Sequence, residues 1–257
     1  MLAFYTHLLD RQESIFAMAD RWVTGAAGGR ASGSPIDISR FAGVPQLKAF
    51  RRFVKDVADV ATPLLATTAA RLLESTASAD DVLDRFVRGV SLAEVAETLG
   101  CEPVTLAFFP RAFIQPVAEA ALGRLRDRHA AEEASTTPAS CPQCGWPPQL
   151  ASLVDEAEVR GRRLLLCSLC GDEWTFPRAT CPVCGEADAN LLPYHLSESW
   201  AHVRVEECKS CHAYLKAVDL RIDGLAVPVV DEIASVELDL WASEQGLAKI
   251  QSNLLGL

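Results

Sequence analysis

Hydrophobic positions in the first 130 residues recur at the spacing of α-helices. The segment after Pro45 has apolar side chains at Leu47, Phe50, Val54 and Val57. A repeat of three to four residues places apolar side chains on one face of a helix, which can then pack against a core. The pattern predicts an amphipathic helix here, as one element of a helical bundle.

Further helices are marked by residues that favour helix starts and ends. Thr62 and Pro63 are typical of an N-cap followed by a first helical residue. Ser91 and Glu94 have the spacing of a capping box, and Gly100 is suited to end the helix that follows it. These signals divide the helical region into several short helices.

The longest apolar stretch of this region runs from Val104 to Arg128. It continues the helical pattern, but it contains Pro110 and Pro116, and proline removes a backbone donor inside a helix. We therefore predict that the two prolines split this stretch into shorter helices. Residues 25–36, rich in Gly, Ala and Ser, are expected to form a flexible loop.

Beyond residue 140 the pattern changes to short segments with the composition of β-strands. Residues 163–167 and 202–206 lead into two pairs of cysteines with the spacing Cys-x-x-Cys. Residues 173–176 and 213–217 follow these pairs. Later, apolar residues at Ile233, Val236, Leu240 and Trp241 indicate one last helix. The last helix is expected to pack back on the rest of the chain.

Eight of the nine cysteines form four Cys-x-x-Cys pairs, and only Cys101 lies outside them. A disulfide framework is the first alternative, but it suits small exported domains with an even cysteine count. Metal binding in the cytosol is the better interpretation. The expected metal ligands are Cys141, Cys144, Cys167, Cys170, Cys181, Cys184, Cys208 and Cys211.

The cysteine pairs also reveal an internal repeat of about 40 residues. The sequence C-P-x-C-G occurs at 141–145 and again at 181–185, and C-x-x-C occurs at 167–170 and again at 208–211. Sequential pairing places Cys141, Cys144, Cys167 and Cys170 at one site, and the other four at a second. Pairing across the two repeats is an alternative, although it would close longer loops.

The turn chemistry supports this interpretation. In C-P-x-C-G the proline fixes φ after the first ligand, and the glycine permits a left-handed conformation after the second. Backbone N–H groups then face the sulfur atoms. Four thiolates arranged tetrahedrally suit zinc, as in a zinc ribbon, or a rubredoxin-type iron centre, and the spacing does not distinguish these metals.

These signals together predict an α+β fold in which a helical domain precedes two metal modules. Each module is too small for a good core of its own, so its metal ion is expected to supply much of its folding energy. The expected boundaries are a helical domain at 1–130, a linker at 131–140, rubredoxin-like modules at 141–178 and 179–217, and a C-terminal strand and helix within 218–257.

Charge and composition exclude several classes of function. The net charge is −10, and residues 141–217 carry 7 basic against 10 acidic side chains, which disfavours binding to nucleic-acid phosphates. No apolar run is long enough for a membrane span. The first residues lack the basic and apolar segments of a secretory signal, so we expect a cytoplasmic protein.

The remaining chemistry-bearing residues have simpler interpretations than metal binding. Cys101 is expected to be an inert thiol, and His195, His202 and His212 are not needed as ligands because four cysteines fill each site. Trp146 and Trp174 are expected to serve packing. No phosphate loop, catalytic triad or carboxylate pair is recognisable, so we expect no catalytic residues and no enzyme activity.

At the level of whole motifs, the chain resembles the FdhE family of formate dehydrogenase accessory proteins. The resemblance rests on the motifs at 141–145, 166–174, 178–185 and 208–216, and on the segments 238–246 and 253–257. It covers roughly residues 141–257. The helical region matches only in general character.

The resemblance implies a non-catalytic maturation factor in the cytoplasm. Such a factor acts as a chaperone that binds the catalytic subunit of a molybdenum- or tungsten-dependent formate dehydrogenase during assembly. The family's cysteine pairs correspond to all four pairs of this chain, and iron is the metal that the resemblance implies. A redox protein with rubredoxin-type iron centres is the alternative, because all-sulfur centres can also carry electrons.

Overall fold

The chain forms two compact units, and the sequence divides between them after residue 131. The computed structural model describes residues 2–19, 21–23, 36–126, 139–254 and 256. Almost all of the predicted loop at 25–36 and of the predicted linker at 131–140 lies outside these ranges. The two units are therefore described separately.

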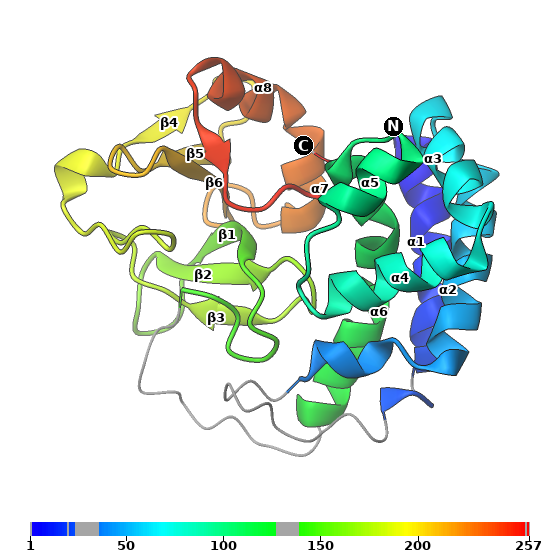
Figure 1. Cartoon of the computed structure of the whole chain (residues 1–257). Coiled ribbons are helices and arrows are strands. Elements are labelled where there is room, and N and C mark those ends of the chain that lie inside the picture. Colours follow the sequence, from blue (N-terminus) through cyan, green and yellow to red (C-terminus); the bar gives the residue numbers. More distant parts are fainter. Residues whose placement is uncertain (1, 20, 24–35, 127–138, 255, 257) are drawn as a thin grey trace. The chain divides into compact units, whose positions relative to one another are not determined.

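The first unit is helical, as the hydrophobic pattern predicts. Helix α6 contacts α1, α2, α3, α4 and α5, so it is the element around which this unit is organised (Figure 1). The helices are α1 (Leu2–Ala19), α2 (Val44–Ala58), α3 (Pro63–Leu73), α4 (Thr76–Val87), α5 (Ala93–Leu99) and α6 (Pro103–Arg126), with a 3-10 turn, η2, at Ile38–Phe41.

Aromatic side chains fill the core of the helical unit. The ring of Phe113 on α6 lies 5.4 Å from that of Phe50 and 5.7 Å from that of Phe53, both on α2, and 6.1 Å from that of Trp22. Phe113 is completely buried. Burial of such side chains supplies the main driving force for packing these helices.

Two details of the helical prediction are wrong. Helix α6 runs unbroken from Pro103 to Arg126 with Pro110 and Pro116 inside it. Most of its residues from 106 to 122 are buried, and this burial outweighs the backbone hydrogen bonds that the prolines remove. In addition, Leu92 rather than Ser91 is the N-cap of α5, although the Ser91 hydroxyl accepts a hydrogen bond from the Ala93 N–H.

The second unit is built on a single sheet that contains the strands of both cysteine repeats. The strand order is β3-β2-β1-β6-β5-β4, and β7 pairs with β6 outside this path. Strands β1 and β6 are parallel, and they join the repeats in the middle of the sheet. The strands are β1 (Pro148–Val154), β2 (Arg162–Cys167), β3 (Glu173–Thr175), β4 (Tyr194–Leu196), β5 (Val203–Glu207), β6 (Ala213–Asp219) and β7 (Ala248–Lys249).

The four strand segments that the sequence indicates are confirmed as β2, β3, β5 and β6. The α+β fold class, with helices first and two four-cysteine clusters after them, is confirmed as well. The boundaries of the two modules remain predictions, because one sheet runs through both.

The C-terminal region differs from the predicted strand and helix. It contains two helices, α7 (Pro228–Ala234) and α8 (Val236–Glu244), followed by the two-residue strand β7. Ser235 separates the helices with φ −87° and ψ 37°, while its hydroxyl and carbonyl oxygens accept hydrogen bonds from Lys216. This buried polar contact favours the break between α7 and α8 at Ser235. The spacing of apolar residues does not indicate this break.

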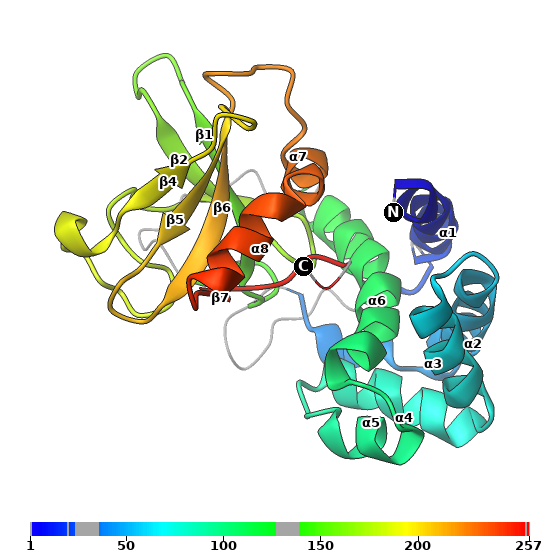
Figure 2. The same ribbon diagram turned by 90° about the horizontal axis from the view of Figure 1, so that it is seen from above.

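Helix α8 covers one face of the sheet beside β5 and β6 (Figure 2). Leu238 and Ala242 of α8 belong to a buried apolar cluster with strand residues on that face. The cluster members are Val203, Val205, Tyr214, Val218, Leu238, Ala242 and Leu247. The cysteine-bearing turns thus project from a sheet whose one face is fixed by the C-terminal helices.

Candidate metal centres

The two C-P-x-C-G turns have the same backbone geometry. The Gly145 N–H donates to the Cys141 carbonyl at 2.9 Å, and the Gly185 N–H donates to the Cys181 carbonyl at 3.0 Å. The glycines have φ of 79° and 77°. These values confirm the predicted left-handed conformation, which lets the chain fold back so that both sulfur atoms of a pair face the same point.

The second pair of each repeat forms a similar turn, but its final residue differs. Gly171 follows Cys170 with φ 69°, whereas His212 follows Cys211 with φ 57°. The His212 N–H donates to the Cys208 carbonyl at 2.8 Å. Among the described residues other than glycine, His212 alone has a positive φ. The sequence pattern did not indicate this conformation, because the equivalent position of the first repeat is a glycine.

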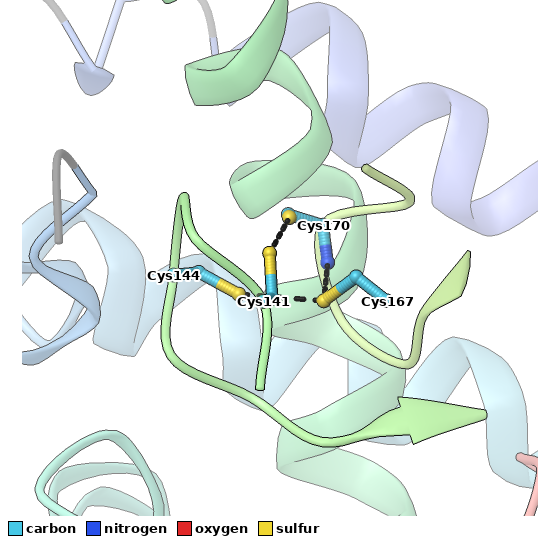
Figure 3. Close-up of side chains that lie close together, drawn as sticks. All are labelled: Cys141, Cys144, Cys167 and Cys170. Atoms are coloured by element: carbon cyan, nitrogen blue, oxygen red, sulfur yellow. Dashed lines mark hydrogen bonds between the residues drawn. The ribbon is translucent and has the colours of Figure 1, made fainter. Parts of the chain in front are cut away.

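The first quartet consists of Cys141, Cys144, Cys167 and Cys170, whose sulfur atoms point toward one another (Figure 3). The Sγ atoms of Cys141 and Cys170 lie 3.5 Å apart, and those of Cys144 and Cys167 lie 3.4 Å apart. All four side chains are buried. The structure thus brings together the set that sequential pairing predicts.

The second quartet consists of Cys181, Cys184, Cys208 and Cys211. The Sγ atoms of Cys181 and Cys211 lie 3.7 Å apart, and those of Cys184 and Cys208 lie 3.6 Å apart. In contrast to the first quartet, Cys184 is exposed and Cys211 is partly exposed. The two centres therefore share a geometry and differ in their access to solvent.

The geometry of both quartets fits a single metal ion. Within each quartet, every pair of sulfur atoms lies within 4.8 Å. Four sulfurs at about 2.3 Å from a central ion in a tetrahedron are separated by about 3.8 Å, close to the distances observed. A disulfide requires about 2.05 Å between sulfurs, and all eight cysteines are free. The two quartets could thus hold two ions, and the geometry does not identify the metal.

Backbone N–H groups stabilise negative charge on the sulfur atoms. Cys167 Sγ accepts hydrogen bonds from the Leu169 and Cys170 N–H groups, each at 3.4 Å. Cys141 Sγ and Cys181 Sγ each accept one from the residue two positions later, also at 3.4 Å. Such bonds favour thiolates and so prepare each site for a cation.

The thiols of each quartet influence one another's pKa. Hydrogen bonds shared with Cys141 raise the pKa of Cys144 and Cys170 and lower that of Cys167. In the second quartet, burial raises the pKa of Cys211 to about 12, while the Glu186 N–H lowers the pKa of Cys184. A bound ion would favour the thiolate form of all four sulfurs and would displace any protons they carry.

The rings of two histidines in the second repeat contact carboxylates. His195 Nε2 lies 2.7 Å from Glu207 Oε2, and His202 Nε2 lies 2.9 Å from Asp231 Oδ1. Cys101 belongs to neither quartet. Among the described residues, neither group that could hold a metal ion includes a histidine.

One contact beside the second quartet has no counterpart in the sequence predictions. The Ser210 hydroxyl donates to Glu186 Oε2 at 2.6 Å, and this bond links the two cysteine turns of that site. At the first quartet the corresponding positions are Leu169, which is fully buried, and Trp146, which is partly buried. Alignment of the two repeats reveals this difference, although the cysteine spacing alone does not.

Two domain models of one family match the cysteine-bearing half of the chain. Residues 140–178 match the central domain of FdhE, and residues 180–255 match its C-terminal domain.

Among the described residues, no helix is both long enough and apolar enough to cross a membrane.

Curated relatives match the same region. A Protein FdhE homolog of Aquifex aeolicus is 38% identical over 151 residues, which cover 59% of this chain and 52% of that protein. A Protein FdhE homolog of Haemophilus influenzae is 41% identical over 109 residues, which cover 42% of this chain and 35% of that protein. The chain thus spans about half of the first relative's length and about a third of the second's.

A solved structure shares the fold. The crystal structure of the FdhE protein from Pseudomonas aeruginosa is similar with a TM-score of 0.62 at 22% sequence identity, covering 95% of this chain and 78% of that one. The central and C-terminal FdhE domains follow each other here in sequence order, each with one complete cysteine quartet. Over residues 140–255, the chain is similar to the central and C-terminal domains of the FdhE family.

Proposed function

We propose that this protein is a non-catalytic accessory factor in the maturation of formate dehydrogenase. It binds the catalytic subunit of that enzyme in the cytoplasm and acts as a chaperone during assembly. The single observation that carries the proposal is the pair of complete cysteine quartets within the matched FdhE domains. The catalytic subunit as partner, the cytoplasm as compartment and the role during assembly are taken from the family resemblance.

The eight cysteines are the proposed ligands of two metal ions, one in each quartet. The buried first quartet supports a structural role, since an ion there would tie the turn before β1 to the turn between β2 and β3. Iron is the proposed metal on the basis of the resemblance, and zinc fits the same four-sulfur geometry. An ion would neutralise part of the thiolate charge, while the N–H groups hold the sulfur atoms in place.

The charge of the protein supports a protein client rather than a nucleic acid. The net charge of −10 disfavours binding to the phosphate backbones of nucleic acids. Zinc ribbons that bind nucleic acids rely on an excess of basic residues. The cysteine-bearing half of this chain has no such excess.

The proposal is tested by affinity capture of the tagged chain, without oxygen, from cells that produce formate dehydrogenase. We expect the catalytic subunit to co-purify, and we expect deletion of the gene to abolish most formate dehydrogenase activity. The variant Cys144→Ser should fail to restore activity, whereas Cys101→Ser, which changes a cysteine outside both quartets, should restore it. Absence of the subunit from the capture, with full activity in the deletion strain, would refute the proposal.

A redox role is the second candidate. The partial exposure of the second quartet, at Cys184 and Cys211, favours it, because electron transfer and thiol exchange both require an accessible centre. Bound iron with a reversible reduction potential would support this role, and tightly bound zinc would exclude electron transfer through the metal, because zinc has no redox chemistry here.

A further inference from the structure

The two cysteine quartets have nearly the same internal geometry, but different side chains surround them. At the first quartet, all four cysteines are at most 4% exposed. At the second, Cys181 and Cys208 are equally buried, while Cys184 is exposed and Cys211 is partly exposed. Any difference in reactivity between the centres must therefore arise from their surroundings.

Two residues near the cysteines differ in character between equivalent positions of the two repeats. Leu169 of the first repeat, fully buried, corresponds to Ser210 of the second, which is exposed. Trp146 corresponds to Glu186, whose carboxylate accepts the Ser210 hydroxyl. The first repeat thus has apolar side chains at the two positions where the second has an exposed serine bonded to a carboxylate.

The second centre is also approached by a cavity. A cavity of about 70 Å³, room for a few water molecules, borders Cys181 and Cys208. Its lining includes Arg163 and Arg178. Arg163 is buried, yet its Nε has no hydrogen-bond partner in the described structure, and Arg178 is exposed.

Nearby groups of both signs contribute to the field in this cavity. Arg163 pairs with Glu206 at 2.7 Å, and Arg204 pairs with the same carboxylate. Glu207 also lines the cavity and contacts His195. Three guanidinium groups thus stand against two carboxylates in the cavity lining. Their excess of one positive charge would offset part of the −2 charge of four thiolates with a divalent ion, and so reduce the repulsion of an incoming anion.

We propose that the second quartet is an exchangeable metal site that opens at Cys184 to an external thiolate, while the first quartet keeps its ion. This inference rests on the metal ligation proposed above. In the exchange, the incoming sulfur would bond to the ion as the bond from Cys184 broke, and Cys184 would leave as a thiolate that takes up the proton released when the incoming thiol ionised. No electron is transferred, so no oxidant or reductant is needed.

The experiment loads the full chain with Zn²⁺ and follows zinc release with a colorimetric chelator in the presence of a competing thiol. One arm uses dithiothreitol, and the other uses a synthetic Cys-x-x-Cys peptide, so that a small thiol is distinguished from a protein thiol. We expect release of one of the two ions in a fast phase and of the other in a slow phase. The arm with the larger fast rate identifies the source of the thiolate.

Variants assign the phases to the sites. Cys184→Ser should leave the second site without its ion, so that one ion per chain remains and the fast phase disappears, and Cys101→Ser should leave both phases unchanged. Cys184→Ser could also disturb folding, so a second variant carries Glu186→Trp with Ser210→Leu. These changes give the second site the residues that the first site has at the same positions. This second variant should keep two ions and slow the fast phase toward the slow one.

The outcomes separate this inference from the proposed function. Release of both ions at one rate, or a fast phase that survives Cys184→Ser, would overturn the exchange proposal while leaving two metal centres in place. A loaded chain that holds no zinc would instead remove the metal ligation on which both proposals depend.

Discussion

Ala151 of β1 and Ala217 of β6 lie opposite each other in parallel register, and their strands join the two cysteine repeats in one sheet. Sequence spacing suggests two independent modules, but strands of both repeats share backbone hydrogen bonds at this junction. Unfolding of one repeat should therefore destabilise the adjacent strand of the other repeat.

Replacing Cys144 with Ser tests this coupling. The change should eliminate one metal ion and the hydrogen-exchange protection of β1 and β2, because metal binding supplies much of the folding energy of such a site. Protection in β6 should weaken, since β1 is its neighbour, while α6 keeps its protection. The comparison is made by hydrogen-exchange mass spectrometry with Cys101→Ser as the control. Native protection of β1 and β2 in the Cys144→Ser variant would contradict this prediction.

Replacing His212 with Gly should stabilise the second unit by about 1 kcal/mol, since a residue with a side chain is strained at a left-handed φ such as 57°. The measurement is urea unfolding of the metal-loaded protein. Gly171→Ala, the reverse change at the corresponding turn of the first repeat, should destabilise by a similar amount. A loss of stability in His212→Gly would indicate that the histidine ring makes a contact more important than the backbone strain.

The parts of this structure that follow local rules could be predicted from the sequence. Cys141 and Cys144, with the glycine that follows them, specify their turn, and period-two alternation identifies β5. The helix break at Ser235 and the continuity of α6 through Pro110 depend on tertiary contacts, which a local pattern does not contain. The same holds for β1, whose residues are buried on both faces of the sheet and show no alternation.

Lys216 should be among the most important side chains for the stability of the second unit. It is fully buried, and its Nζ lies 2.6 Å from Asp239 Oδ2 and 3.5 Å from Glu232 Oε1. Lys216→Met would leave these buried carboxylates without one of their two cations, at a cost of about 3–5 kcal/mol. Urea unfolding measures the loss, and Lys48→Met, at an exposed helical position, should change stability by less than about 0.5 kcal/mol. Equal effects of the two changes would contradict the buried network.

Tyr214 should make stability decline in alkaline solution. Burial, and the neighbouring Asp239 that accepts its hydroxyl at 2.8 Å, raise the pKa of Tyr214 above its usual range. Glu232 adds to this shift, and Lys216 and Lys249 belong to the same buried network. The unfolded phenol loses its proton near pH 10 and the folded one does not, so stability falls as pH rises above about 10.

The comparison of wild type with Tyr214→Phe isolates this effect. Absorbance at 295 nm should be equal for the two folded proteins up to about pH 11, and unfolding should add one further phenolate only in the wild type. A difference that already develops in the folded proteins near pH 10 would show that the Tyr214 hydroxyl ionises without unfolding.

The central claim is that eight sulfur atoms hold two ions, four to each ion. Its most direct test is elemental analysis combined with thiol counting on protein purified without oxygen. The account predicts two equivalents of iron or zinc per chain and eight cysteines that react with a thiol reagent only after the metal is removed. A metal-free protein whose Cys-x-x-Cys thiols are joined in disulfides would contradict it.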